Sequence, residues 1–419
     1  MPGEAAALAP TDRRTMKVVG LVSLGHFFSH LFYMLIPPLF PVLKEALAAD
    51  YTSLGLVITA YSAVSAAAQV PIGFLVDRYD AAVVLVIGLA AASIAIIAIG
   101  LYPSYTVLFA FMLLLGLGDS VFHPADYSIL SQTVRPDMLG RAFSVHGFAG
   151  HLGFAAGPLI VITLASIWDW RAALITSGSA GLLVAMLLFK CRDKLRSRPN
   201  SSSERREDSA QAATGGFSVL LSAPLLLGLL FFAGLALTGT GVRDFGIATL
   251  HVLYDAPLTQ AGTVVSAFLF ASPIGVLMGG WIADHTVHHD RIAMAALMVV
   301  ATVAFLVAGL TPSLFIVATL FGFAGLGIGA MAPSRDMLIV KLTPEGHIGK
   351  AFGFVSVGLG VGGIIGPVTF GYLLDHSAPN SVFWLAGGFA LLTVICLIPI
   401  GRLIRRGETQ HQPMAKDLK

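Results

Sequence analysis

A short polar segment with three titratable side chains interrupts an otherwise apolar part of the chain. The segment GDSVFHPADYS spans residues 118–128 and contains Asp119, His123 and Asp126. On a continuous α-helix, spacings of four and three residues place these side chains on one face. A carboxyl group in low-dielectric surroundings can take up and release a proton, and a nearby imidazole can exchange that proton with it. The segment therefore predicts a proton-coupling pair formed by Asp119 and His123.

Each of the three residues also has a structural interpretation, which the sequence leaves open. Asp119 can accept hydrogen bonds between helices in a fixed network, and the sequence His123-Pro124 can simply bend a helix. Asp126 comes later in the segment, within reach of Arg141 at the start of the next helix. An ion pair between Asp126 and Arg141 at a gate is therefore favoured over contact with a substrate.

More histidines occur in neighbouring apolar segments. His26 and His30 are one helical turn apart, and His151 lies in a later segment. A helical pair of histidines can bind a transition metal, but two ligands do not make a site. A third ligand would have to come from His151, His123 or Asp119. We therefore expect contacts with an organic ligand, or a polar network, and no metal site. His146 is interpreted as structural.

An arginine followed by an aspartate marks another apolar segment of the second half. The segment GTGVRDFG contains Arg243 and Asp244 after a Gly/Thr-rich stretch, where we expect the helix to break. A guanidinium group stays charged and offers a planar fork, so Arg243 is suited to an anionic substrate group. Asp244 equally indicates partial neutralisation and a role in a gate. The predicted substrate-binding residues are His26, His30, Tyr33, Phe122, Tyr127, His151 and Arg243.

The composition indicates that these polar residues lie inside a membrane. The chain is 56% hydrophobic and 11% charged, whereas soluble domains carry about 25% charged residues. A bilayer-spanning helix needs about 20 mostly apolar residues, and the apolar runs yield twelve such spans in two sets of six. The start of the chain lacks the pattern of a cleavable signal peptide. The two cysteines lie far apart, so no disulfide framework is expected.

The predicted fold is an all-α membrane protein with two pseudo-symmetric six-helix bundles. Most of the 25 Lys and Arg residues fall in the tails, in the linker and in loops on one side. The positive-inside rule therefore predicts an inner-membrane protein with both termini in the cytoplasm. The predicted domains are a tail at 1–16, a bundle at 17–192, a polar linker at 193–216, a second bundle at 217–406 and a tail at 407–419.

The two halves of the chain repeat each other. GLGDSVFHPADYSILSQTVRPDMLGRAF (116–143) aligns without a gap on GLGIGAMAPSRDMLIVKLTPEGHIGKAF (325–352). The same offset places Gly157-Pro158 on Gly366-Pro367. Two six-helix halves of like topology, joined by a linker, are typical of transporters built from parallel repeats.

Three motifs make the whole chain resemble the major facilitator superfamily. GFLVDRYD (73–80) resembles the superfamily's loop between helices 2 and 3, and GFAAGP (153–158) resembles the antiporter-type element of helix 5. SVFHP (120–124) with GHFFSH (25–30) is similar to fosmidomycin-resistance-type efflux proteins. The resemblance implies a central cavity lined by helices 1, 4, 7 and 10, which carry most of the polar residues above.

The same resemblance implies gates at the helix ends. Asp126 aligns with Arg335 of the repeat, and opposite charges at these positions suggest a latch at the inner gate. The predicted gating residues are Asp77, Arg78, Asp126, Arg141, Asp244, Arg335 and Asp336.

Together these features predict a secondary transporter that works by alternating access. We expect proton-coupled export, by antiport, of a small polar or amphiphilic organic compound or drug, such as an anionic phosphonate. The alternatives are proton-coupled uptake of an organic anion, movement of a transition metal through the histidines, and a membrane sensor or lipid-handling protein without turnover. Phosphate-binding loops, HExxH and catalytic triads do not occur in the sequence. The chain is therefore not expected to be an enzyme, to need a cofactor or to bind nucleic acid, and we expect a monomer.

Overall fold

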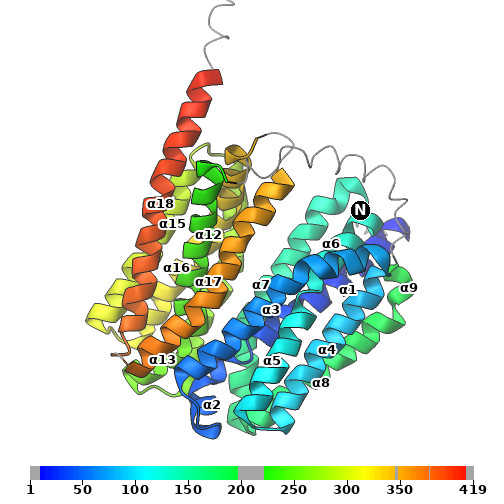
Figure 1. The fold of residues 1–419 in the computed structure, drawn as a ribbon, viewed down its shortest axis with the longest axis vertical. Helices are drawn as coiled ribbons and strands as arrows, with labels where there is room; N and C mark the ends of the chain where they lie inside the picture. Colours follow the sequence, from blue (N-terminus) through cyan, green and yellow to red (C-terminus); the bar gives the residue numbers. More distant parts are fainter. Residues whose placement is uncertain (1–9, 197–220, 345–347, 377, 412–419) are drawn as a thin grey trace, which may run out of the picture. The chain divides into compact units, whose positions relative to one another are not determined.

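The protein is a bundle of long helices. The computed structural model describes residues 10–196, 221–344, 348–376 and 378–411, and these residues contain helices but no strand (Figure 1). Twelve of the helical segments described are long and apolar enough to cross a membrane. This confirms the predicted all-α membrane fold.

The chain forms two compact units, the first made of Met1–Ile36 and Val64–Asn200. This unit, called unit 1, holds most of the helices of the N-terminal half. Its helices are α1 (Pro10–Tyr33), the later part of α3 (Tyr51–Arg78), α4 (Ala81–Leu101), α5 (Tyr105–Asp119), α6 (Phe122–Thr133), α7 (Pro136–Ile167), α8 (Trp170–Lys190) and α9 (Arg192–Leu195).

The second compact unit, unit 2, consists of Pro37–Ala63 and Ser201–Lys419. It includes the start of α3 and all the helices of the C-terminal half. Its elements are η1 (Pro37–Leu39), α2 (Phe40–Ala46), α12 (Ala223–Gly239), the π-helical segment η3 (Thr240–Asp244), α13 (Gly246–Tyr254), α14 (Leu258–Asp284), α15 (His289–Leu310), α16 (Leu314–Leu342), α17 (Ile348–His376) and α18 (Ser381–His411).

Equivalent helix pairs pack together in the two halves. In unit 1, α1 packs against α7 and α4 against α8, and in unit 2, α12 packs against α17 and α15 against α18 (Figure 1). Two glycines explain the close approach of α7 to α1. A Cβ atom on Gly153 would overlap the backbone carbonyl of Phe27, and one on Gly157 would overlap Met34. The internal repeat of the sequence is therefore a repeat of helix packing.

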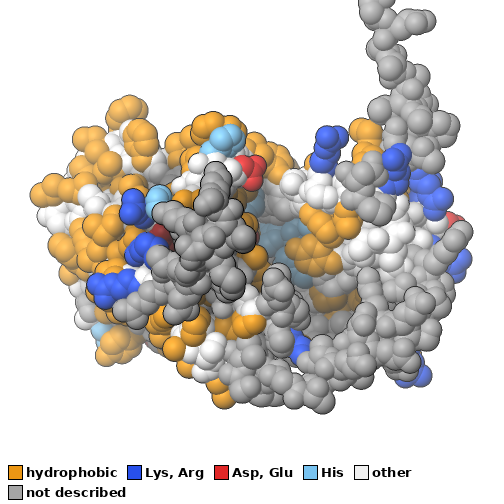
Figure 2. All heavy atoms as spheres, turned by 90° about the horizontal axis from the view of Figure 1, so that it is seen from above, with side chains coloured by type: hydrophobic (Ala, Val, Ile, Leu, Met, Phe, Trp, Pro, Cys, Tyr) orange, Lys and Arg blue, Asp and Glu red, His pale blue; other side chains and the backbone are white. Residues whose placement is uncertain are grey.

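Basic residues gather at one end of each unit. Short connections join the successive spans of unit 1, so α3 ends, α7 begins and α8 ends at the membrane side where α1 begins. Arg78, Arg135 and Lys190 lie at these three helix ends, and Arg291 and Lys341 occupy comparable positions in unit 2. Lys and Arg side chains are visible on the face shown in Figure 2. This distribution follows the charge bias of the sequence.

The first residues beyond the last span of unit 1 are ordered. The predicted polar linker at 193–216 begins inside the short helix α9 (Arg192–Leu195), whose Leu195 is fully buried. Arg196 then pairs with Asp80, with 3.2 Å between Nε and Oδ2. The predicted linker bounds remain a prediction. The remainder of the predicted linker lies outside the described residues.

A carboxylate of α17 holds the segment Pro37–Ala63 within unit 2. Asp375 accepts hydrogen bonds from the backbone N–H of Tyr51 at 3.0 Å and of Thr52 at 2.8 Å. It also accepts the hydroxyl hydrogen of Thr52 at 2.8 Å and lies 3.4 Å from the Lys44 ammonium. Asp375 thus satisfies the first backbone donors of α3 from another helix.

Further contacts extend this attachment along α3. Thr59 donates to the backbone carbonyl of Ile364 at 2.7 Å, and Gly55 lies so close to the carbonyl of Pro367 that a Cβ atom would overlap it. Asp50, just before α3, accepts hydrogen bonds from Ser53, which lower the pKa of its carboxyl group. We call the contacts of Asp375 with Lys44, Tyr51 and Thr52 the α17 clamp.

The clamp predicts the effect of removing one charge. In Asp375→Asn, the carboxylate that accepts these bonds is lost, and a hydrogen bond to a charged group contributes about 1.5–3 kcal/mol. We expect α3 to separate from α17 at least about ten times more often. The measurement is the labelling rate of a cysteine at Ser62, which lies beside Gly363 of α17, in a chain with Cys191→Ser and Cys396→Ser.

Asp255→Asn is the matched control for this experiment. Asp255 is exposed and ends α13 in a left-handed conformation that asparagine also adopts. Its substitution should leave the labelling rate unchanged. Equal rates in Asp375→Asn and in the control would show that the clamp does not hold α3.

Candidate functional site

The helix that carries Asp119, His123 and Asp126 is broken. Helix α5 ends at Asp119, Ser120 and Val121 form a turn, and α6 begins at Phe122. Pro124 has no N–H to donate to the carbonyl of residue 120, and its ring crowds that carbonyl. The expectation that the three titratable side chains share one continuous helical face was therefore wrong. The break directs them toward different neighbours.

Asp119 faces the later part of α3. The hydroxyl of Ser65 donates to Asp119 Oδ2 at 2.8 Å, and the Asp119 side chain is partly buried. His123 instead lies among other aromatic rings, with its centroid 5.3 Å from that of His26 and 6.0 Å from that of Tyr127. The proton-coupling role predicted for Asp119 and His123 remains a prediction, with Ser65 as an additional neighbour of the carboxyl group.

Asp126 is completely buried between two histidines of other helices. Its Oδ2 lies 3.4 Å from His26 Nδ1 of α1 and 3.7 Å from His146 Nε2 of α7. The side chains of Asp126, His26 and His146 are 0%, 4% and 2% exposed. In the described part of the chain, neither oxygen of the Asp126 carboxylate makes a hydrogen bond. His26 Nδ1 and the two ring nitrogens of His146 make none either.

The ion pair predicted between Asp126 and Arg141 is not formed. Arg141 is exposed, and it lies more than one helical turn before the buried His146 on the same helix. Asp126 projects instead into the space between α1 and α7, beside His26 and His146. A gating role for Asp126 and Arg141 is thus not supported by a contact between them.

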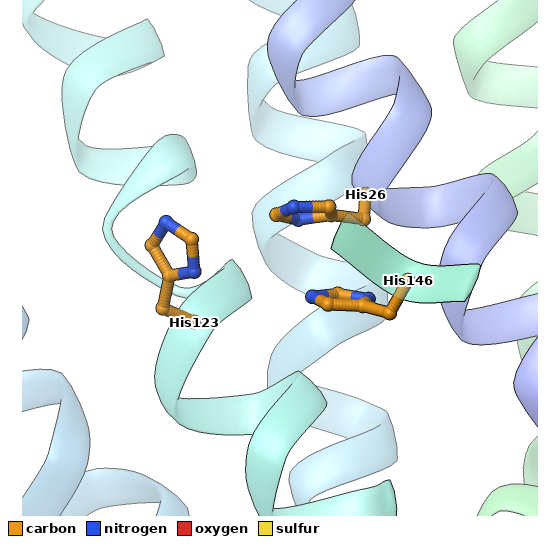
Figure 3. A group of neighbouring side chains, drawn as sticks. All are labelled: His26, His123 and His146. Carbon is orange, nitrogen blue, oxygen red and sulfur yellow. The ribbon is translucent and has the colours of Figure 1, made fainter. Parts of the chain in front are cut away.

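The histidines form a cluster at the centre of unit 1. In Figure 3 the rings of His26 and His146 lie one above the other and extend toward His123. Their centroids are 3.8 Å apart, and the rings are stacked. His30 adds a hydrogen bond of 3.1 Å between its Nε2 and that of His26. We call His26, His123, His146 and Asp126 the His/Asp cluster.

His146 is the member that sequence reasoning missed as a functional residue. Its place in the cluster depends on the close packing of α7 on α1, and a Cβ atom on Gly150 would overlap the rings of His26 and His30. A glycine four residues after a histidine, at the spacing of one helical turn, was the available signal. It suggested that another helix approaches α7 on the side where His146 lies.

The other residues predicted to contact substrate occupy different environments. Phe122 is 1% exposed and packs in the core, so the structure does not support its predicted contact with a substrate. Tyr33 is buried beside Phe154, with 5.9 Å between ring centroids, and His151 is partly buried. Tyr127 is 48% exposed and lies next to His123, which makes it the most accessible of these aromatic residues.

Two arginines of unit 2 each pair with the following aspartate. Arg243 lies in the π-helical segment η3, which confirms the expected break in that helix. Its Nε and Nη2 donate to both oxygens of Asp244, at 2.7 and 3.1 Å. Arg335 of α16 donates through Nε to Asp336 at 2.8 Å, and its guanidinium lies 5.1 Å from the ring centroid of Phe232.

The loop between α3 and α4 differs from the expected gate. Asp77 and Arg78 are exposed at the end of α3. Asp80 instead caps α4 by accepting the N–H of Ala82 at 3.0 Å, and it also pairs with Arg196. The gating role predicted for Asp77 and Arg78 remains a prediction, and the structure adds Asp80 as the carboxylate that fixes the loop.

The second half of the chain shows which residues stand at the repeat positions of three of these polar residues. The repeat offset places Ile328, Ala332 and Val355 at the positions equivalent to Asp119, His123 and His146. Val355 is completely buried in unit 2. The same helix packing therefore forms with apolar residues at these positions, so the fold does not require the polar ones.

The buried carboxyl group of Asp126, whose oxygens make no hydrogen bond in the described part of the chain, is expected to reduce stability. In Asp126→Asn, the new amide can donate to His26 Nδ1, which satisfies an unpaired buried atom. We expect the variant to unfold at a higher temperature in chelator-treated buffer, with a gain of about 1 kcal/mol. Asp375→Asn should shift the melting temperature downward in the same assay. If the melting temperature of Asp126→Asn instead fell by as much as that of Asp375→Asn, this account of the cluster would be contradicted.

Comparisons with known proteins assign the chain to a family. The family model described as Major Facilitator Superfamily matches residues 22–253 and 235–417. The fosmidomycin resistance protein of Escherichia coli (strain K12) is 23% identical over 403 residues, which cover 94% of this chain and 96% of that protein. The probable sulfoacetate transporter SauU of Cupriavidus necator is 24% identical over 430 residues, covering 94% and 97%.

A solved structure shows the same fold. The crystal structure of a bacterial homologue of the human lysosomal transporter Spinster, in an inward-facing and unoccupied conformation, matches with a TM-score of 0.74. It is 14% identical and covers 95% of this chain, and the match spans 97% of the other chain. The relatives are transporters and not enzymes. The chain therefore belongs to the Major Facilitator Superfamily and is a secondary transporter with twelve membrane-spanning helices.

Proposed function

We propose that the protein exports a small organic anion or amphiphilic drug in exchange for protons. The observation that carries this proposal is the division of charged groups between the halves. Unit 1 holds protonatable carboxyl and imidazole groups inside its spans, and unit 2 holds two guanidinium groups. Ionisable residues in spans are costly and usually face a pathway. The carboxyl and imidazole groups of unit 1 would take up and release protons, and the guanidinium groups of unit 2 would bind an anion.

Asp119 is the proposed site of proton coupling. It is a carboxyl group within the span Tyr105–Thr133, where the ionised form is poorly solvated. The Ser65 hydroxyl provides a hydrogen-bond donor to the ionised carboxylate. Because the helix is interrupted after Asp119, α5 can change its angle to α6 at this point of the span. Proton uptake and release at Asp119 would then accompany movement of α5 against α3.

Arg335 is the proposed anchor for an anionic substrate. Arg243 already directs two nitrogens to both oxygens of Asp244, a bidentate pair that neutralises much of its charge. Arg335 contacts Asp336 through Nε, and a guanidinium has four further N–H donors on its Nη groups. The side chain of Arg335 is 27% exposed and its guanidinium faces the Phe232 ring, which would orient its planar fork.

The names of the relatives support this class of substrate. One is named for fosmidomycin resistance and another for sulfoacetate. Export fits the first name, and sulfoacetate is an organic anion. Uptake of an organic anion by proton symport is the second candidate function, favoured by the two arginines. A sensor or lipid-handling protein would bind a ligand without moving it.

The proposed setting is the bacterial inner membrane, with both termini in the cytoplasm. The basic residues at the end of unit 1 where α1 begins support this orientation, because cytoplasmic loops are enriched in Lys and Arg. The start of α3, and with it the α17 clamp, would then lie on the outer side of the membrane. We propose that the protein works as a monomer by alternating access, with Asp77, Arg78, Asp244 and Asp336 acting at the gates.

Proteoliposomes with an internal pH dye test the coupling. Fosmidomycin and sulfoacetate, added separately, should trigger proton movement in the wild-type protein and not in Asp119→Asn, because the amide cannot carry a proton. Asp193→Asn is the matched control, since Asp193 is 77% exposed in α9. Substrate flux without protons in wild type and variant would exclude proton coupling. The sign of the proton movement relative to substrate flux separates antiport from symport.

Substitutions of Arg335 test the anion site in the same vesicles. Arg335→Lys keeps the charge but loses the planar fork, so we expect KM to rise by about tenfold or more with a smaller change in maximal rate. Arg335→Gln should weaken transport further. Arg291→Gln removes an exposed charge at the start of α15 and should leave KM unchanged. Unchanged kinetics in both Arg335 variants would exclude Arg335 as the anchor.

A further inference from the structure

Three histidines of unit 1 bring metal-binding atoms together from three different helices. One ring nitrogen from each of His26, His123 and His146 lies within 4.8 Å of the others. These residues belong to α1, α6 and α7, and Figure 3 shows their rings grouped around a common space. Residues so far apart in the sequence meet there because α7 packs closely on α1. A set of three imidazoles is a common ligand set for zinc.

The buried polar atoms of this cluster need a partner. Both oxygens of Asp126, His26 Nδ1 and both nitrogens of His146 are buried and make no hydrogen bond with any part of the chain that the structure describes. Each unsatisfied buried polar group costs about 1–3 kcal/mol. A cation that accepts their lone pairs would satisfy several of them at once. Asp126, completely buried and directed at both histidines, points to such a ligand independently of the histidines themselves.

We propose that His26, His123, His146 and Asp126 bind one divalent transition-metal ion of the zinc class. Imidazole nitrogens suit zinc, copper, nickel and iron, whereas magnesium and calcium prefer oxygen ligands. The Asp126 carboxylate serves as the fourth ligand and supplies negative charge. Sequence reasoning had sought a third ligand in His151, His123 or Asp119, and the structure adds His146 and Asp126.

Two of the distances in the cluster already match a tetrahedral ion, and the stacked rings of His26 and His146 would turn to direct a nitrogen each at it. Ligand atoms bound to zinc at about 2.0–2.1 Å in a tetrahedron lie about 3.4 Å from each other. Asp126 Oδ2 lies 3.4 Å from His26 Nδ1 and 3.7 Å from His146 Nε2, so these two pairs of atoms are already close to that spacing. His123 has to move inward, and it is exposed, whereas His26 and His146 are buried.

His30 would act as a supporting residue. Its Nε2 lies 3.1 Å from His26 Nε2, which leaves His26 Nδ1 to face Asp126 and the ion. Metal-binding histidines usually make such a second hydrogen bond, which fixes the ring and its tautomer. The partly exposed Tyr127 beside His123 marks the side from which an ion would enter.

Direct binding measurements with zinc and cobalt test the proposal on the purified full-length protein. Equilibrium dialysis should give one Zn²⁺ per chain, and Co²⁺ should give the visible absorption of a tetrahedral site. We expect His26→Gln and His146→Gln, which keep a polar side chain of similar size, to weaken binding at least tenfold. His251→Gln and His285→Gln are the controls, because the Nδ1 atoms of these histidines lie against backbone carbonyls outside the His/Asp cluster. The controls should bind as the wild type does.

A cysteine substitution separates ligation from a purely structural role. His123→Cys should still bind Co²⁺ and should add an intense near-ultraviolet band from thiolate to cobalt, since thiolate is also a ligand for these metals. Cys191→Ser and Cys396→Ser in the same chain remove other thiols. Gel filtration of each variant shows whether it is folded.

Two results would overturn the proposal. One is the absence of bound zinc in folded wild-type protein, and the other is binding that the His26 and His146 variants leave unchanged. Either result would make the cluster a neutral polar network. The experiment does not depend on the organic substrate, so it can fail while the proposed proton-coupled export stands.

Discussion

A membrane interior offers no water to satisfy polar groups, and the rest of this structure depends on that constraint. The backbone meets it by forming helices throughout the spans, since each helix satisfies its own N–H and C=O groups. Polar side chains and helix ends must find partners elsewhere. Asp375 shows a complete solution, because three hydrogen bonds and an ammonium group surround its carboxylate. Asp126 shows an incomplete one, with both oxygens buried and without a hydrogen bond in the described structure.

The contrast between these two aspartates separates structural from functional polar groups. A carboxylate whose donors are all supplied by the fold contributes to holding helices together. A carboxyl group that the fold leaves unsatisfied has a free-energy cost, and it needs a proton, a cation or a change in conformation to reduce that cost. The neighbours of Asp126 are imidazoles, which can supply either protons or metal ligation. Such a group is suited to a transport cycle, in which its surroundings must change.

The two halves share the same helix packing but place different kinds of side chain between the helices. Close approach at Gly153 and Gly157 in α7 has its equivalent at Gly362 and Gly366 in α17. The helix pairs are therefore alike, although the side chains between them are not. Imidazole and carboxyl groups occupy positions in unit 1 where unit 2 has Ile328, Ala332 and Val355. Because unit 2 forms the same helix pairs with apolar residues at these positions, Asp119, His123 and His146 require an explanation other than folding.

The sequence by itself determined the membrane fold, the repeat and the family. These depend on the length of the apolar runs, on the distribution of charges and on short motifs. All of them can be read from the chain itself or from the alignment of its two halves. Sequence patterns also identified most of the polar residues of the cluster, because a titratable residue within an apolar span is conspicuous. The break in the helix of Arg243 was foreseen for a similar reason, since Gly and Thr weaken a helix locally.

Only the tertiary structure decided which polar residues meet. Asp126 lies between His26 of α1 and His146 of α7, and no pattern in the sequence identified these two partners. Gly150 and Gly153 set how near α7 comes to α1, and this distance brings His146 to His26 while Arg141 stays exposed. Asp375 reaches the start of α3 from more than three hundred residues away along the chain. Helix rotation and separation arise from the packing of whole surfaces, and local periodicity does not contain that information.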